Sequence, residues 1–249
     1  MTELNNLLIT IARCPIAMDG TARENPSHAC NRIVRCQKHD YFYLPEPWSG
    51  RIDIAPVLFI SSNPSVAHEE YYPTAEWQDT EILDFFRNRF AEPNGQALGF
   101  RPLLRNGHRD RVVSFWANAR GRAAEALGKK KEDVKPGIDY ALTEVVYCKS
   151  KGEEGVSEAA RVCSDRYLRK VLSLSVAKVF IVLGEKARSL IERDLRPGDV
   201  PTQENPYRAQ IAGENRLIAF LPHPNAFKRK TLLGVLGKDG LKAIQQELR

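Results

Sequence analysis

Four short apolar runs separated by helical patterns constrain this chain more than any other feature. The runs are rich in Val, Ile, Leu and Phe and occupy residues 56–60, 142–147, 178–183 and 217–221. Apolar runs of this length are typical of strands that are buried on both faces of a parallel sheet. Parallel strands need long crossover connections, which the intervening segments can supply as helices.

Helical periodicity supports the same interpretation. It recurs at residues 80–90, 110–127, 157–174, 185–195 and 232–248. We therefore predict an α/β fold with three α/β/α layers around a central four-stranded parallel sheet. A chain of 249 residues fits one such domain, and we expect residues 1–50 to be an N-terminal extension of it. Phe115 and Trp116 share one face of the helix predicted at 110–127, and we expect them in the core. Residues 201–210 have the composition of a polar, turn-rich insertion.

Composition narrows the class of protein. The hydrophobic fraction is 43% and the charged fraction 27%, with no apolar run long enough to cross a bilayer and no signal-peptide pattern at the N-terminus. We expect an intracellular, cytoplasmic protein without a membrane partner. The formal net charge of +6 favours polyanionic partners such as nucleic acid.

Two polar motifs follow predicted strands. "SSNPS" (61–65) carries Asn63 into a turn fixed by Pro64, and "PHPNAFKRK" (222–230) holds His223 between two prolines. Ligands of parallel sheets bind beyond the carboxyl ends of the strands, so we expect Asn63 to order a water there and His223 to stabilise developing negative charge. Alternatively, Asn-Pro is only a turn former and His223 is structural.

The five cysteines suggest a metal centre. Their odd number, in a chain without an export signal, argues against a disulfide framework. Cys148 closes a predicted strand, Cys163 lies in the next helical pattern, and Cys30 and Cys36 lie together upstream. Four thiolates suit a [4Fe-4S] cluster or a structural zinc, and unliganded core thiols are the remaining alternative.

"FISSNPS" and the distant "HPNAF" resemble the two signature motifs of the uracil-DNA glycosylase superfamily. The Asn before Pro is similar to the mismatch-specific branch, whereas "EVVYC" followed by Cys163 resembles the iron-sulfur branch. The resemblance implies a monomeric, nucleoid-associated DNA glycosylase of base excision repair. Such an enzyme hydrolyses the N-glycosidic bond of uracil or another deaminated or damaged base in DNA and leaves an abasic site.

The resemblance also implies roles for individual residues. Asn63 would position the water and His223 would stabilise the leaving base through its O2. Tyr72, Glu144, Ser61 and Ser62 would bind the base, with Tyr72 as the stacking ring. Glu144 departs from the family, which has an Asn at this position. An ionised Glu only accepts hydrogen bonds, whereas a protonated one would restore the donor.

The C-terminal motif and the cysteines complete the implied site. Phe227 would fill the gap left by a flipped base, while Asn225, Lys228, Arg229 and Lys230 would bind the DNA backbone. Cys30, Cys36, Cys148 and Cys163 would hold the cluster. The upstream pair is spaced more widely than the family's usual Cys-x-x-Cys, which makes Cys14 a rival ligand.

Two other functions stay open at this point. The chain could be a DNA-binding or damage-sensing protein that keeps the fold without catalysis, which the Glu at position 144 would permit. It could also be an unrelated nucleotide-binding α/β hydrolase whose Asn-Pro and His-Pro turns match the motifs by chance.

Overall fold

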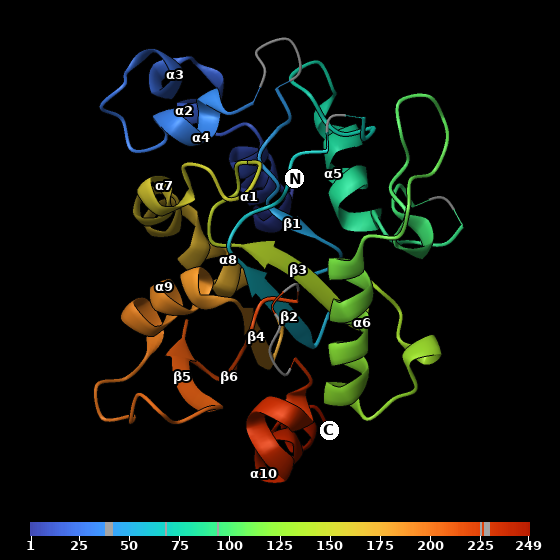
Figure 1. The fold of residues 1–249 in the computed structure, drawn as a ribbon, viewed down its shortest axis with the longest axis vertical. Helices are drawn as coiled ribbons and strands as arrows, with labels where there is room; N and C mark the ends of the chain where they lie inside the picture. Colours follow the sequence, from blue (N-terminus) through green and yellow to red (C-terminus); the bar gives the residue numbers. More distant parts are fainter. Residues whose placement is uncertain (38–41, 68, 94, 225, 227–229) are drawn as a thin grey trace.

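A six-stranded mixed sheet forms the centre of the molecule (Figure 1). The computed structural model describes residues 1–37, 42–67, 69–93, 95–224, 226 and 230–249. Along the sheet the strands follow the order β1-β3-β2-β4-β6-β5. Their bounds are β1 (Trp48–Ser49), β2 (Val57–Ser61), β3 (Tyr140–Glu144), β4 (Val179–Leu183), β5 (Tyr207–Ile211) and β6 (Glu214–Leu221).

The four predicted apolar runs form the parallel centre of this sheet, β3-β2-β4-β6. The prediction of a purely parallel, four-stranded sheet was nevertheless wrong, because β1 and β5 add antiparallel edges. β1 has only two residues, too few to give a strand pattern. β5 is covered on one face only, so Arg208 and Gln210 are exposed and the segment reads as polar.

The β5–β6 hairpin explains why a strand occurs in the predicted insertion. Ala212 and Gly213, between the two strands, have φ angles of 52° and 84°. Positive φ at both central residues is the geometry of a type I′ turn, whose twist matches that of paired strands. The local turn therefore places β5 beside β6 despite its polar sequence.

Ten α-helices surround the sheet in the described part of the chain. They are α1 (Glu3–Ala12), α2 (Pro15–Met18), α3 (Thr21–Glu24), α4 (Asn31–Arg35), α5 (Asp79–Asn88), α6 (Ser114–Leu127), α7 (Val156–Cys163), α8 (Arg169–Leu174), α9 (Glu185–Leu195) and α10 (Leu232–Glu247). The helix predicted at 157–174 is divided: a π-helical turn, Ser164–Leu168, joins α7 to α8. None of the described helices is long and apolar enough to cross a membrane.

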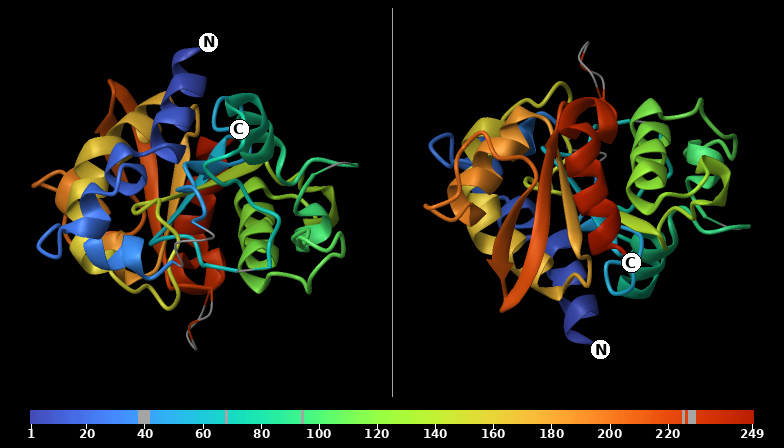
Figure 2. Two further views of the ribbon diagram at one scale, coloured as in Figure 1. Left: turned by 90° about the horizontal axis from the view of Figure 1, so that it is seen from above. Right: turned by 90° about the horizontal axis from the view of Figure 1, so that it is seen from below.

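Helices cover both faces of the sheet, so two separate hydrophobic cores form (Figure 2). Side chains alternate along each strand: Leu58 and Ile60 of β2 enter one core, and Val57 and Phe59 enter the other. The first core also contains Leu8 and other residues of the N-terminal helices. The described residues among 1–50 therefore include helices that pack on the sheet and share its core.

Candidate functional site

Asn63 lies just beyond the carboxyl end of β2. Three hydrogen bonds from its amide nitrogen fix its side chain. That nitrogen donates hydrogen bonds to Ser150 Oγ at 2.9 Å, to the Pro64 carbonyl at 3.0 Å and to the Cys148 carbonyl at 3.4 Å. Among the described residues none donates a hydrogen bond to Oδ1 of Asn63. The side chain is thus oriented so that its oxygen can accept a hydrogen bond from a ligand or a water.

His223 follows β6 and is half-buried. Gly184, at the end of β4, has φ +88°, and a Cβ there would lie 3.4 Å from Cβ of His223. The ring of Phe115 lies beside the imidazole, with centroids 5.8 Å apart. Burial lowers the pKa of His223, and the nearby Lys230 lowers it further. Glu153 raises it, but by less than burial lowers it. The imidazole is therefore neutral near pH 7 and can donate one hydrogen bond.

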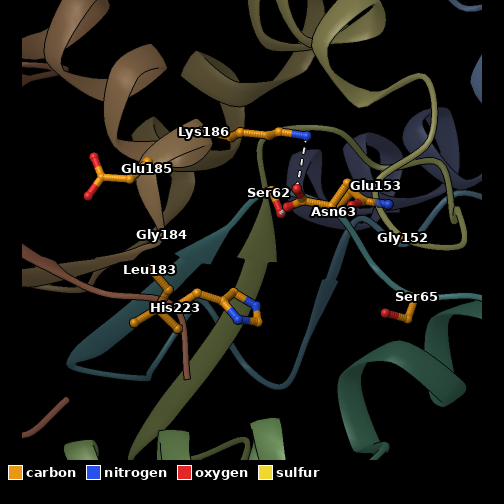
Figure 3. Close-up of a pocket in the computed structure, with 10 residues that line it drawn as sticks. All are labelled: Ser62, Asn63, Ser65, Gly152, Glu153, Leu183, Gly184, Glu185, Lys186 and His223. Carbon is orange, nitrogen blue, oxygen red and sulfur yellow. Dashed lines mark hydrogen bonds and ion pairs between the residues drawn. The ribbon is translucent and has the colours of Figure 1, made fainter. Parts of the chain in front are cut away.

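Two adjoining cavities share Asn63, Ser65 and His223 in their walls. The outer cavity, of about 410 Å³, opens beside α9 and is drawn in Figure 3. The inner cavity, of about 180 Å³, extends beneath α6 and is bordered by Glu46, Ser61, Glu70, Arg89, Phe115, Trp116, Glu144 and Lys149 among others. The structure therefore brings the two predicted motif residues together at the junction of the two cavities.

Glu144 lies in the wall of the inner cavity, opposite Ser61. The strand predicted at 142–147 is β3, which ends at Glu144. The carboxyl group of Glu144 therefore stands at the strand end, in register with Ser61 of β2. Ser61 Oγ donates a hydrogen bond to Glu144 Oε2. Burial raises the pKa of Glu144 to about 8, even though Ser61 and the cations Lys149 and Arg89 lower it. The carboxyl group is thus largely protonated near neutral pH.

A buried charge network forms the floor of the inner cavity, and sequence reasoning missed it. Arg89 donates to Glu46 at 2.8 Å and also pairs with Glu70. Lys149 lies 3.5 Å from Glu46 and 3.6 Å from Glu70. Burial alone would raise the pKa of Glu46, but Arg89 and Lys149 lower it to about 2. The four residues are far apart in the sequence, and no local pattern connects them.

The aromatic residues of the inner cavity differ from the prediction. Tyr72 is only 2% exposed and does not border the cavity. Its hydroxyl donates to Glu46 at 3.0 Å, and its ring packs edge-on against Tyr43 and Phe85. The cavity wall instead contains Phe115 and Trp116, which also pack against the core that contains Val57 and Phe59, as predicted. Tyr72 is therefore a core residue beneath the charge network, and the placement does not support its predicted stacking role.

Ser62 faces the outer cavity, whereas its neighbour Ser61 faces the inner one. Ser62 Oγ donates a hydrogen bond to Glu153, whose other carboxylate oxygen is paired with Lys186 Nζ at 2.9 Å. Figure 3 shows the imidazole of His223 pointing toward the part of the cavity where Asn63 and Glu153 lie. Glu153 was not among the predicted site residues.

The predicted DNA-binding loop is described only in part. Asn225, Phe227, Lys228 and Arg229 lie outside the described residues. The ammonium group of Lys230 donates to the carbonyl oxygen of Pro224 at 2.6 Å. Lys230 is therefore tied back to the residue that follows His223.

The five cysteines gather between the N-terminal helices and α7. Burial raises the pKa of Cys148 well above its ordinary value, and each of the other four thiols raises it further. Cys14 also raises the pKa of Cys30, and Cys14 and Cys30 raise that of Cys163. The thiol of Cys36 donates a hydrogen bond to the Ile33 carbonyl at 3.0 Å. As the described side chains stand, no three His, Cys, Asp or Glu residues have the geometry of a metal site.

The donor set nevertheless fits a thiolate-bound metal. Several buried thiols that disfavour one another's ionisation can become thiolates together only beside a positive charge, which a metal centre supplies. Cys14 raises the pKa of Cys30, Cys148 and Cys163, whereas Cys36 raises that of Cys148. Cys14 is therefore a candidate for the fourth ligand beside Cys30, Cys148 and Cys163, in the place that Cys36 has in the predicted set.

The sequence matches no known protein-family model and no curated protein.

Proposed function

We propose that this chain is a DNA glycosylase that hydrolyses the N-glycosidic bond of uracil or another deaminated or damaged base in DNA. The observation that carries the proposal is that Asn63 and His223, one from each motif, both border the inner and the outer cavity. A nucleotide whose base enters the inner cavity and whose sugar stays in the outer one would have its glycosidic bond beside these two residues. Enzymes that act on bases in a duplex flip the nucleotide into such a pocket.

The chemistry follows from the two side chains. The neutral imidazole of His223 would donate a hydrogen bond to the base as it departs with negative charge. Oδ1 of Asn63, oriented by the three bonds of its amide nitrogen, would accept a hydrogen bond from the attacking water. An amide cannot take the proton, so most of the rate would come from stabilising the leaving group.

Recognition of the base would depend on the inner cavity. Phe115 and Trp116 offer aromatic surface on which the base can stack. A protonated Glu144 presents an O–H donor and a carbonyl acceptor side by side. This pair complements the adjacent N–H and C=O groups of a deaminated base, such as uracil or hypoxanthine. Glu144 would thus perform the reading role of the amide that the resembling family has at this position.

A [4Fe-4S] cluster, or alternatively a zinc ion, would be held by Cys14, Cys30, Cys148 and Cys163. Bound there, it would cross-link the N-terminal helices to the segment after β3 and to the end of α7, and so stabilise the fold. The Cys148 carbonyl accepts a hydrogen bond from Asn63, which connects this region directly to the catalytic residue. No step of the hydrolysis needs the metal.

A strand-cleavage assay tests the function. Duplex and single-stranded oligonucleotides that contain uracil, hypoxanthine, xanthine or a thymine mismatch are incubated with the protein, then treated with alkali to break abasic sites. We expect cleavage at one or more of these bases. Tight binding of the same DNA without cleavage would favour the non-catalytic damage sensor, and neither binding nor cleavage would refute the proposal.

A further inference from the structure

In the proposed reaction the sugar becomes positively charged, and neither Asn63 nor His223 supplies a negative charge beside it. Glu153 is a carboxylate that lies close to both residues. It borders the outer cavity together with Asn63 and His223 but does not border the inner one. In the proposed binding mode the sugar occupies the outer cavity, so Glu153 would face the sugar and not the base. Figure 3 shows its side chain next to Asn63, with Lys186 approaching from α9.

The local backbone holds Glu153 in this position. Glu153 has φ +60°, a left-handed conformation that a residue with a side chain rarely adopts. Gly152 and Gly155 beside it also have positive φ. The carboxylate is further fixed by Ser62 Oγ, which directly precedes Asn63 in the chain, and by Lys186 at 2.9 Å. A strained, doubly anchored carboxylate at a cavity wall is expected where position matters for function.

We propose that Glu153 is a further catalytic residue, whose carboxylate stabilises the positively charged sugar in the transition state and accepts a proton from the attacking water. This inference rests on the proposed glycosylase function. Glu153 supplies what Asn63 lacks, since an amide carries no charge and takes up no proton. Burial would raise the pKa of Glu153, but Lys186, Ser62 and His223 lower it, so the group is ionised near neutral pH.

The step balances with one water. The bond between C1′ and the base nitrogen breaks, and its electron pair leaves with the base, which His223 stabilises. The water oxygen forms a bond to the cationic C1′, and one water proton passes to the carboxylate of Glu153. That carboxylate is partly exposed and returns the proton to solvent, while the departing base takes up one proton. The products are the free base and an abasic sugar with a hydroxyl group.

Two substitutions and two abasic-site analogues test the inference. Duplex DNA that carries a cationic pyrrolidine at the abasic position mimics the charged sugar, and a neutral tetrahydrofuran is its matched control. We expect the wild type to prefer the pyrrolidine by about tenfold or more. Glu153→Gln should lose this preference while it binds the tetrahydrofuran duplex normally. It should also lose roughly 100-fold in single-turnover excision, and Glu153→Asp should restore part of both effects.

Glu154→Gln is the matched control, because Glu154 pairs with Arg32 and does not border the outer cavity. It should behave as wild type, and all variants should melt at similar temperatures. A Glu153→Gln variant that keeps both the pyrrolidine preference and the excision rate would overturn the inference, as would a wild type without the preference. A wild type that shows the preference but excises none of the tested bases would instead refute the proposed function and with it the catalytic role of Glu153, and would leave only a charge contact between Glu153 and the sugar.

Discussion

Asn63 and His223 follow strands that do not pair with each other, yet they border the same two cavities. β4 separates their strands, and Gly184 at its end keeps the space beside His223 clear of a side chain. Because all three strands are parallel, their carboxyl ends meet at one edge of the sheet. This edge is where the inner cavity joins the outer one.

Removal of an aromatic ring should distinguish Phe115 from Tyr72. Phe115→Ala should weaken excision by roughly ten- to 100-fold, which corresponds to the 1–3 kcal/mol typical of one stacked base. Tyr72→Leu removes a buried ring that does not border the cavity, so it should lower stability while leaving the excision rate of the folded protein nearly unchanged. Single-turnover rates on one oligonucleotide, measured below the melting temperature of each variant, check both substitutions. A greater loss of excision rate in Tyr72→Leu than in Phe115→Ala would contradict this assignment.

The charge network should be important for stability. Arg89→Met leaves the carboxylates of Glu46 and Glu70 buried with only Lys149 to compensate them. We expect the free energy of unfolding to fall by about 3–5 kcal/mol, as it does when one partner of a buried pair is removed. Arg161→Met, which breaks an exposed pair with Asp165, should leave the urea midpoint almost unchanged. Similar midpoints for both variants would show that the network contributes little.

Glu144 should make excision depend on pH. Its pKa of about 8 means that the protonated form predominates below that pH, so excision should be high near pH 7, where His223 is neutral, and should decline as pH rises through 8. Burial raises this pKa most, Glu46 raises it further, and Ser61, Lys149 and Arg89 lower it. Glu144→Gln keeps a donor and an acceptor and should abolish the decline. A wild-type rate that rises through pH 8, or an identical decline in both proteins, would argue against the protonated form as the reader.

The raised pKa of Glu144 also predicts how the free energy of unfolding changes with pH. Between pH 4.5 and about 8 the native carboxyl group stays protonated while the unfolded one ionises. The native state then binds more protons, so the free energy of unfolding falls as pH rises, by at most about 1.4 kcal/mol per pH unit. Above pH 8 this contribution becomes constant. Urea titrations of wild type and Glu144→Gln across this range should therefore diverge, and parallel curves would contradict the raised pKa.

Cysteine variants should separate the two candidate ligand sets. Cys14→Ser and Cys30→Ser should each abolish stoichiometric metal, whereas Cys36→Ser should retain it. Iron and zinc contents of anaerobically purified protein, together with the thiolate-to-iron absorbance band, provide the measurement. Metal that is lost in Cys36→Ser but kept in Cys14→Ser would restore the set predicted from the sequence.

The elements with strong local patterns could be predicted, and those that depend on long-range contacts could not. The parallel centre and α9 follow from apolar runs and helical periodicity. β5 was missed because its exposed residues are polar, and the end of β3 was misplaced because Val145, Val146 and Tyr147 are buried without being in the strand. Asn63 and His223 stand out by their motifs. Arg89, Lys149 and Glu153 carry no such signal, since only the folded chain gives them partners.

The most direct test of the central claim is the single-turnover excision rate of His223→Ala compared with that of the wild type, on the base that the wild type removes best. If His223 stabilises charge that develops only in the transition state, its loss should cost on the order of 100-fold or more, as the loss of other such donors does. Substrate binding should change little, because the ground state lacks this charge. Equal excision rates in the two proteins would contradict the account.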